Sequence, residues 1–316
     1  MDVTLPNGIS VTTYSPSAEF DPLTADNADL EKNGFPPRPA DPVHLARWNK
    51  VMSSLKGRLN YITPTFEYNP DIVHGPRVKS ALTDGTEVST NWSGAVVTPP
   101  AGYSFYWVNG DWVIPAVTAP TASGTYYCAS WIGIDGDGDD EASGGGEVCQ
   151  AGIGSQVSGN GQPGYYAWWE WYPGGSYAIT NFPVAPGDMV TLLLCTSGQG
   201  SATARAYFAN RTTGATTSFT FTAPRGTVLA GGCAEWIVEA PQVSNQQSAL
   251  ADYGQIFFSD CFAFAENPAG ASATVYPDSG DSINLYTNPA DSSTEVSATT
   301  LYPPNVAECE YVGALP

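Results

Sequence analysis

The amino-acid sequence predicts an all-β protein, an antiparallel sandwich or barrel, preceded by an N-terminal segment with one helix. From Asn91 onward, short runs of β-branched and aromatic residues alternate with Gly, Pro, Asn and Ser, which is typical of strands joined by turns. The part before residue 86 lacks this pattern and holds eight of the eleven basic residues. We therefore expect an N-terminal segment at residues 1–86 and a β domain at residues 87–316.

The N-terminal segment shows one clear element. Residues 1–40 have no hydrophobic periodicity, and we expect them to be extended or partly disordered. A helix is predicted at about residues 42–55, with Asp41 as its N-cap and an apolar stripe at Leu45, Trp48, Met52 and Leu55. Because one amphipathic helix cannot bury its own stripe, it should dock on the β domain. Residues 76–90 are predicted to be a linker.

The β domain is predicted from ten runs of strand-forming residues with turn residues between them. The runs are residues 93–97, 105–113, 129–134, 165–172, 189–195, 202–208, 218–222, 234–239, 254–258 and 271–276. Neither a helix nor an internal repeat is expected in this part. All-β domains of this length are common as single units.

The charge distribution limits the chemistry that the β domain can perform. The domain contains 21 acidic residues against three arginines, a net charge of −18, with neither lysine nor histidine. A Ser-His-Asp or Cys-His mechanism, a zinc site built from imidazoles and a lysine Schiff base are therefore excluded within it. Carboxylates, amides and hydroxyls remain as catalytic groups. The negative charge also repels nucleic acid and anionic membranes, so neither is an expected partner.

The same composition favours a protein that works in acid. Asp and Glu titrate near pH 4, so much of the self-repulsion disappears there. A chain with few cations also has few ion pairs to lose on acidification, which is the usual route of acid unfolding. Solubility at neutral pH is the alternative reason for such a charge.

Cysteine usage predicts disulfides in an oxidising compartment and hence a secreted protein. Six cysteines, an even number without a CxxC pair, lie in the β domain. They are Cys128, Cys149, Cys195, Cys233, Cys261 and Cys309. No stretch is long enough to span a membrane, and the first residues show no signal peptide.

The segment at residues 165–172 is the most unusual of the chain, because its one glutamate lies among six aromatic residues and one alanine. Strand alternation puts Trp168, Glu170 and Tyr172 on one face. Trp169 and Trp171 then lie on the other face. A carboxylate between aromatic side chains is typical of a substrate cleft, and a core strand with an edge glutamate is the alternative.

A second carboxylate, Glu239, ends the strand-like run at residues 234–239. A glutamate beside apolar residues should have a raised pKa because burial disfavours its charged form, which suits it to proton transfer. A solvated glutamate at the edge of a sheet is the alternative interpretation.

The acidic turn that begins at Asp135 resembles a calcium loop only in part. Asp135, Asp137 and Asp139 occupy positions 1, 3 and 5. Positions 6 and 12 are Asp140 and Gly146, where the EF-hand loop requires Gly and Glu. No flanking helices are expected, and the ligands would protonate in acid. A Gly-rich surface turn explains the pattern more simply, so no metal is predicted.

Taken in order, several motifs resemble those of the glutamic peptidases, or eqolisins, such as the fungal acid glutamic endopeptidases. The resemblance covers about residues 88–260 in register. Any one motif is weak, but eight in the same order are specific. They are Asn-Trp-Ser-Gly-Ala-Val-Val at 91–97, Trp-Val-Ile-Pro at 112–115, Ala-Ser-Trp-Ile-Gly-Ile-Asp-Gly at 129–136, Gln-Ala-Gly at 150–152, Trp-Glu-Trp-Tyr-Pro at 169–173, Arg-Thr-Thr-Gly at 211–214, Ala-Glu-Trp-Ile-Val-Glu at 234–239 and Ala-Asp-Tyr-Gly at 251–254.

The resemblance implies a concanavalin-like antiparallel β-sandwich with a catalytic dyad of Gln150 and Glu239 and no cofactor. It further implies a cleft lined or supported by Trp92, Trp131, Asp135 and Glu170, to which strand alternation adds Trp168 and Tyr172. The chain departs from the family's pattern at residues 240–242 and in the longer, more acidic turn at residues 137–146. Neither departure includes the dyad. The family's N-terminal propeptide matches the boundary that charge places near residue 86.

These expectations combine into an acid endopeptidase made as a zymogen. Glu239 would take a proton from a water and Gln150 would stabilise the oxyanion. Lysines and arginines of the N-terminal segment would pair with the acidic domain and occlude the cleft near neutral pH, until acid permits self-cleavage around residues 76–90. The expected partners are protein or peptide substrates, and the expected state is a monomer.

Two other classes remain possible on the same sandwich. A glycoside hydrolase would use Glu170 and Glu239 as its two carboxylates, with tryptophans stacking on sugars. A carbohydrate-binding lectin would need the tryptophans alone. Polysaccharide binding without peptide cleavage would favour one of these two.

Overall fold

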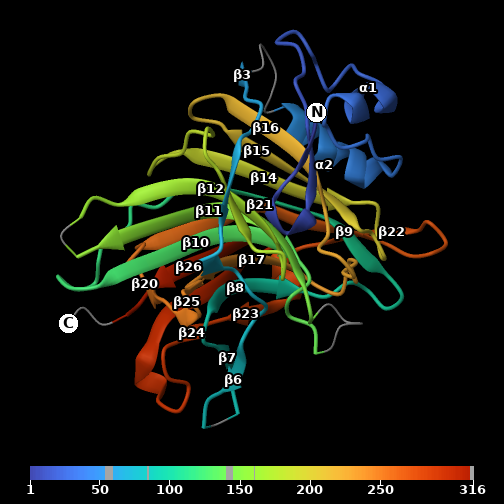
Figure 1. Cartoon of the computed structure of the whole chain (residues 1–316). Helices are drawn as coiled ribbons and strands as arrows, with labels where there is room; N and C mark the ends of the chain where they lie inside the picture. The colour runs from blue at the N-terminus through green and yellow to red at the C-terminus, as the bar shows by residue number, and fades with distance from the viewer. Residues whose placement is uncertain (54–59, 84, 140–144, 160, 314–316) are drawn as a thin grey trace.

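A computed structural model describes residues 1–53, 60–83, 85–139, 145–159 and 161–313 of the chain. Two curved β-sheets pack face to face and place most of the apolar side chains between them (Figure 1). The pairing is antiparallel apart from a few short contacts at the edges. The predicted antiparallel β-sandwich is thus confirmed.

The larger sheet runs from the N-terminal residues of the chain at one edge to the hairpin at residues 79–89 at the other. In spatial order its strands are β1 (Asp2–Thr4), β2 (Ser10–Thr13), β16 (Ala215–Thr222), β15 (Thr203–Asn210), β14 (Met189–Thr196), β9 (Ser104–Val113), β21 (Gln255–Glu266), β26 (Val306–Tyr311), β25 (Glu295–Tyr302), β24 (Leu285–Tyr286), β7 (Glu87–Ser89) and β6 (Lys79–Ala81). Off this path, β22 (Ser272–Val275) pairs with β21 and β3 (Asn60–Tyr61) with β16.

The second sheet carries the residues that the sequence predicts for the cleft. In spatial order its strands are β23 (Asp281–Ile283), β8 (Trp92–Val97), β17 (Ala234–Glu239), β10 (Thr125–Ile134), β11 (Val148–Ser158), β12 (Gly164–Tyr172), β13 (Ser176–Ile179) and β4 (Phe66–Asn69), and β20 (Ala249–Leu250) pairs with β10. A small third sheet consists of β19 (Gln246–Gln247), β18 (Gln242–Val243) and β5 (Ile72–Val73).

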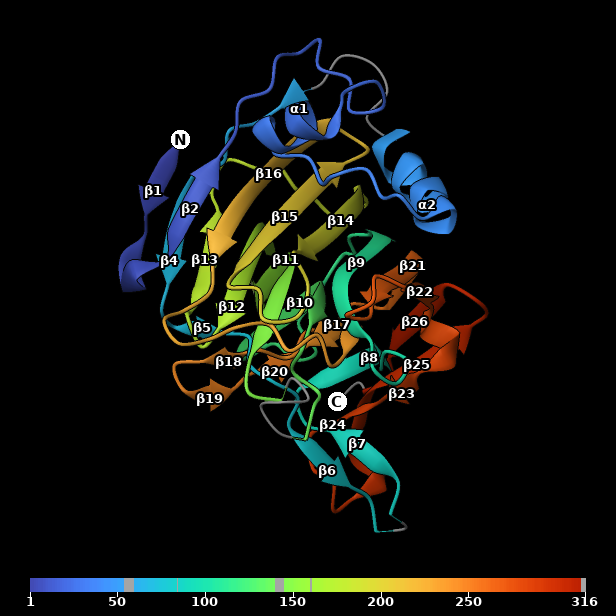
Figure 2. The same ribbon diagram turned by 90° about the vertical axis from the view of Figure 1, so that its right-hand side faces the viewer.

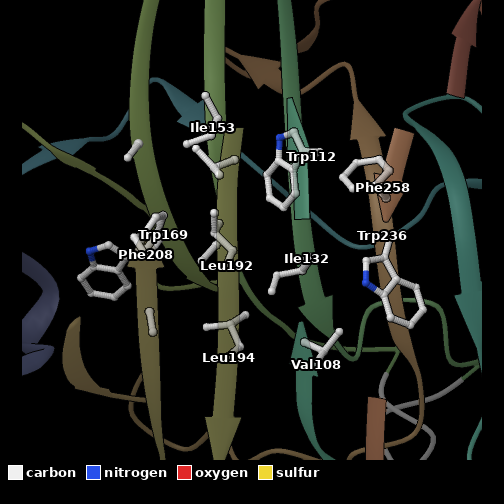
Figure 3. Close-up of a cluster of buried hydrophobic side chains, with 14 of the residues drawn as sticks. Val108, Trp112, Ile132, Ile153, Trp169, Leu192, Leu194, Phe208, Trp236 and Phe258 are labelled. Carbon is white, nitrogen blue, oxygen red and sulfur yellow. The ribbon is translucent and has the colours of Figure 1, made fainter. Parts of the chain in front are cut away.

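The core between the two sheets is filled by aromatic and branched side chains that alternate along the strands (Figure 3). Trp169 of β12 stacks on Tyr177 at 4.7 Å and also contacts Phe221 of the larger sheet at 4.4 Å. Its neighbour Trp171 also belongs to this core. The expected alternation is therefore confirmed for these two tryptophans, and the opposite face of β12 is free to carry the cleft.

The structure contains strands at all ten predicted runs, with ends that differ by a few residues. Several strands lie outside these runs, and the longest of them among the described residues is β11, at the centre of the second sheet. The sequence does not predict β11 as a strand because it contains Gly152 and Gly154, and glycine weakens a strand interior. They are needed there: a Cβ at Gly152 would lie 2.4 Å from the Ser130 carbonyl oxygen, and one at Gly154 would lie 2.5 Å from the Tyr166 ring.

The first 40 residues are more regular than the sequence predicts. β1 and β2 form a hairpin that extends the larger sheet through β16, and a short helix, α1 (Asn27–Lys32), follows. The physical reason is that Ile9, just before β2, and Val11 of β2 are buried in the common core, so tertiary packing orders this segment.

The predicted amphipathic helix is α2 (Pro42–Ser53), and it docks as expected (Figure 2). Trp48 and Met52 pack on the outer face of the larger sheet, against Tyr207 and Phe264 among others. His44 stacks on Phe264 at 3.7 Å. Leu55 and the predicted end of the helix lie outside the described residues. Because α2 covers the outer face of the larger sheet, the helix does not itself cover the second sheet, where the cleft lies.

The rest of the N-terminal segment runs along the second sheet. β4 extends this sheet by pairing with β13, and β5 pairs with β18. Within residues 76–90, which the sequence predicts as a linker, β6 and β7 pair as a hairpin. The segment between β5 and β6 crosses the face that carries the predicted site residues. No helix among the described residues is long and apolar enough to cross a membrane.

The six cysteines, all within the described residues, are buried free thiols, so the structure does not contain the predicted disulfides. Their side chains serve as small apolar groups, and five of them lie in strands. Burial raises the pKa of every one of these thiols, including Cys195 to about 11. An even count without CxxC therefore did not distinguish paired cysteines from core cysteines.

Candidate active site

The predicted site residues come from five neighbouring strands of the second sheet. Glu239 ends β17 and lies opposite Trp92 of β8 in the antiparallel register. Gln150 of β11 lies opposite Glu170 of β12. Trp131 of β10 lies between these two strand pairs, since β10 separates β17 from β11. The register thus gathers the predicted residues on one face because strand alternation sends their neighbours into the core.

Glu239 sits in a buried aromatic setting. Its Oε2 accepts a hydrogen bond from Trp131 Nε1 at 3.1 Å. The Trp131 ring in turn meets Trp92 edge to face at 4.9 Å. Burial raises the pKa of Glu239 well above its ordinary value, and the Trp131 donor only partly opposes this shift. While the segment covers it, this carboxyl is therefore held protonated in acid.

His74 of the N-terminal segment fills the space between Glu239 and Gln150. Its Nδ1 lies 2.8 Å from Glu239 Oε2. Its carbonyl oxygen accepts a hydrogen bond of 2.5 Å from Gln150 Nε2. The two residues of the predicted dyad therefore contact one and the same residue, from two sides. Gln150 Oε1 is buried and has no partner among the described residues.

The other contacts of His74 hold its ring and its backbone. The imidazole stacks on Trp168 at 3.5 Å with an interplanar angle of 12°. The backbone N–H donates to Glu170 Oε2 at 2.9 Å. Burial raises the pKa of Glu170 well above its ordinary value, and the nearby Glu239 charge adds to the shift. Burial also lowers the pKa of His74 to about 3, so the imidazole is held neutral.

The chain around His74 binds the domain as an extended peptide. Before it, β5 adds to β18, and the Ser244 N–H donates to the Asp71 carbonyl at 2.8 Å. Beyond it, Asn91 Nδ2 donates to the Pro76 carbonyl at 3.1 Å. Main-chain hydrogen bonds of this kind are how proteins bind peptides as added strands. The face therefore has the shape and the donors of a peptide cleft.

Tyr172 and Asp135 have different roles at this site. Tyr172 lies beside the cleft, since a Cβ on Gly75 would be 3.7 Å from its ring. Asp135 contacts neither member of the dyad in the described interactions. Its carboxylate accepts hydrogen bonds from the backbone N–H groups of Ala230, Gly231 and Gly232 at 2.7–3.1 Å. Asp135 thus supports the cleft by fixing the loop before β17.

The acidic turn does not gather its carboxylates toward one point. The Asp135 carboxylate faces backbone N–H groups, Asp137 bonds Arg77 and Asp139 bonds Lys79. Asp140, also considered for calcium, lies outside the described residues. Within the described part of the chain no group of three acidic, His or Cys side chains could hold a metal ion.

His74 is the residue of this site that sequence reasoning missed. Both histidines of the chain, His44 and His74, lie in the N-terminal segment, and no local pattern predicts a role for either. The signal available was a histidine followed by Gly75 and Pro76 in a segment expected to occlude the cleft. The position of His74 opposite the dyad depends on the pairing of β5 with β18, and no local sequence pattern predicts that pairing.

Comparison with known proteins places this geometry in a family. A family model described as the peptidase A4 family matches residues 90–302. Aspergillopepsin-2 of Aspergillus niger is 33% identical over 231 residues, which are 66% of this chain and 76% of that protein. Scytalidopepsin B of Scytalidium lignicola is 29% identical over 171 residues, which are 52% of this chain and 57% of that protein.

Solved structures show the same fold. Scytalido-glutamic peptidase with a transition state analog inhibitor superposes with a TM-score of 0.56 at 24% identity, over 71% of this chain and 98% of that chain. SCP-B, an eqolisin bound to the tripeptide Ala-Ile-His, superposes with a TM-score of 0.53 at 22% identity, over the same shares. The matched family model spans every predicted site residue, and the chain belongs to the peptidase A4 family, the glutamic peptidases or eqolisins.

Proposed function

We propose that this protein is an acid endopeptidase that uses Gln150 and Glu239 as its catalytic dyad and is made as a zymogen. One observation carries the proposal: Gln150 Nε2 donates to the carbonyl oxygen of His74 while the Glu239 carboxyl lies against the imidazole of the same residue. A peptide carbonyl held by a buried amide donor, with a carboxyl beside it, has the arrangement needed for acyl transfer to water.

The proposed reaction needs one titrating group. Once the segment has left and water reaches the carboxyl, the ionised form of Glu239 takes a proton from a water as the water oxygen attacks the carbonyl carbon. The Gln150 N–H stabilises the negative charge that develops on the carbonyl oxygen. The C–N bond then breaks, and Glu239 returns the proton to the leaving nitrogen. Glu170 and Trp168 position the substrate, as they do His74, through a backbone N–H and a ring face.

In the full chain, His74 blocks this reaction. Its imidazole lies on the Glu239 oxygen that must face the attacking water, so the bound segment resembles a substrate that cannot be cut. The hydrogen bond from Gln150 Nε2 to the His74 carbonyl oxygen supports His74–Gly75 as the cleaved bond. We therefore propose that the chain cleaves its own His74–Gly75 bond once the imidazole has moved away from Glu239. Cleavage around residues 76–90, which the sequence predicts, would follow as a later step.

Proton linkage gives the pH at which the block should fail. Docking here means the binding of the His74 segment in the cleft. The ordinary pKa values are 4.5 for the Glu239 carboxyl and 6.5 for the His74 imidazole, so between pH 4.5 and pH 6.5 the undocked pair holds one proton, on the imidazole. Docking keeps the number of protons and leaves His74 neutral beside a protonated Glu239. Below 4.5 the undocked pair holds two protons, so docking must release one, and it weakens about tenfold per pH unit down to the pKa of about 3 for docked His74. The pKa of Glu170 is also raised in the docked state, so a fall in pH strengthens docking through this group until the pH reaches its ordinary pKa of 4.5. Below that pH Glu170 has no further effect on docking.

Ion pairs between the segment and the domain should add to the block near neutral pH. Lys50 pairs with Asp260 at 2.5 Å, Arg77 with Asp137 at 3.0 Å and Lys79 with Asp139 at 3.0 Å. Salt screens the two lysine pairs, which are partly exposed, more than the buried Arg77 pair. Near pH 6, raising NaCl from about 0.05 M to about 1 M should therefore increase digestion of an added protein a few-fold. An unchanged rate of digestion would show that the pairs do not hold the segment.

The relatives support the proposal without establishing it for this chain. SCP-B is described in complex with the tripeptide Ala-Ile-His, and residues 72–74 here read Ile-Val-His. Scytalido-glutamic peptidase is described with a transition state analog inhibitor. We further propose protein or peptide substrates, a monomer and an extracellular location, which suits a peptidase that works in acid.

The test is digestion of denatured globin by the full chain at about pH 3.5 and about pH 7, with and without pepstatin. Cleavage in acid alone, unaffected by pepstatin, is the expected result. Absence of cleavage in acid, even after the N-terminal segment has been removed, would overturn the proposal. Binding of a polysaccharide would then favour the glycoside hydrolase or lectin interpretations.

A further inference from the structure

We propose that Asp137, in the acidic turn after β10, selects substrates with arginine or lysine at the third residue after the cleaved bond. This inference rests on the proposed function, because the His74 carbonyl at Gln150 identifies which bond is cleaved. Counting from that bond, Gly75 is the first residue on the leaving side and Arg77 is the third.

The domain holds the backbone of this segment through contacts that any peptide could make. The Arg77 N–H donates to the Gly136 carbonyl at 2.9 Å. Asn91 brackets the same residue, since its Nδ2 donates to the Pro76 carbonyl at 3.1 Å and its Oδ1 accepts from the Val78 N–H at 2.8 Å. A substrate bound by these groups would place its third side chain where that of Arg77 lies.

The Arg77 side chain is buried against an acid of the domain. It is 4% exposed, and its Nη1 donates to Asp137 Oδ1 at 3.0 Å, while Glu87 Oε1 lies 2.8 Å from the same nitrogen. Asp137 is 14% exposed. Burial raises the pKa of Asp137, and the Arg77 charge opposes that shift. A cation at this position therefore compensates a carboxylate that would otherwise be poorly solvated.

The turn is built to keep Asp137 in this place. Gly136 has a φ of 115°, and a Cβ there would lie 2.5 Å from Val148 and 2.8 Å from the Trp92 ring. The turn can therefore lie directly on the cleft tryptophan. The Asp137 N–H also lies 3.3 Å from Cys233 Sγ, which ties the turn to the chain before β17. Pre-positioned groups of this kind bind ligands with less loss of entropy.

The neighbouring acid should contribute much less. Asp139 pairs with Lys79 at 3.0 Å, but its side chain is 92% exposed. Ion pairs between exposed groups contribute little to binding in water. The preference should therefore be specific to the third position and weak at the fifth.

The experiment uses the full chain activated in acid and then assayed at about pH 5, where carboxylates are largely ionised. Two peptides carry histidine before the cleaved bond and differ only at the third residue after it, arginine in one and its uncharged isostere citrulline in the other. Both are assayed with wild type, Asp137→Asn and Asp139→Asn. Cleavage after His74 would leave Arg77 attached to the activated chain, where its side chain could still occupy the site beside Asp137. The variant Arg77→Gln is therefore included, because it removes this competing side chain.

In wild type and Arg77→Gln, kcat/KM for the arginine peptide should be about tenfold or more above that for the citrulline peptide. Asp137→Asn should lose this preference and Asp139→Asn should keep it. Equal cleavage of the two peptides by wild type and Arg77→Gln would overturn the inference, as would a preference that survives in Asp137→Asn. Failure to cleave either peptide would instead count against the proposed function. The peptide pair decides the question with wild type and Arg77→Gln even if Asp137→Asn does not fold.

Discussion

Replacing His74 with alanine should release the block at a pH where the wild-type chain remains closed. The variant loses the stacking on Trp168 and the contact with Glu239, both of which hold the segment in the cleft. At about pH 5–6 we expect its digestion of an added quenched fluorescent peptide to be at least about tenfold faster than that of wild type. The added peptide is the readout because alanine could also slow the cut at its own position.

Phenylalanine at position 74 is the matched control for the titrating ring. It keeps an aromatic face for Trp168 but takes up no proton, so the proton-linked release below about pH 4.5 is lost. His74→Phe should therefore activate about tenfold more slowly than wild type near pH 3. If phenylalanine and histidine gave the same rate at every pH, the side chain would act by bulk alone. The proton-linked account would then be wrong.

Changing Glu239 to glutamine should abolish peptide hydrolysis, with a loss of about 10³-fold or more in kcat. Glutamine has nearly the same shape but can neither take the proton of the water nor return it. Gln150→Ala should cost about 10²- to 10³-fold, since it removes the oxyanion donor. Both rates are measured with the added peptide in acid.

Glu235→Gln provides the matched control for the dyad variants. Glu235 lies on β17 with Glu239 and is likewise buried, and its carboxyl oxygens have no hydrogen-bond partner among the described residues. Burial raises its pKa well above the ordinary value, so the carboxyl is already neutral and glutamine should be tolerated. Full activity in Glu239→Gln would contradict the mechanism, and full activity in Gln150→Glu would undermine the role given to the amide.

The sequence was sufficient for the architecture and for the family. Runs of aromatic and branched residues separated by turn residues located the main strands, and alternation along β12 separated Trp168 from Trp169 correctly. The pairing of Gln150 with Glu239 came from the ordered motifs and not from periodicity. An isolated glutamine in a glycine-rich stretch has no local signature of catalysis.

What the sequence could not supply depends on contacts between distant parts of the chain. β11 forms because large side chains on neighbouring strands require glycine opposite them, which is visible only once Trp131 and Tyr166 are in place. His74 reaches Glu239 across 165 positions of sequence. The basic residues of the N-terminal segment do pair with acids of the domain, but a neutral imidazole and backbone hydrogen bonds hold the part that enters the cleft.

The central claim is that Gln150 and Glu239 act on the peptide bond after His74, and intact-mass spectrometry of the acidified chain tests it most directly. Wild type is brought to about pH 3.5 beside Glu239→Gln and Glu235→Gln, and samples are taken over time. We expect the first pair of fragments to be residues 1–74 and 75–316 in wild type and Glu235→Gln, with none in Glu239→Gln. A first cut at another bond, or the same cut at the same rate in Glu239→Gln, would contradict the claim.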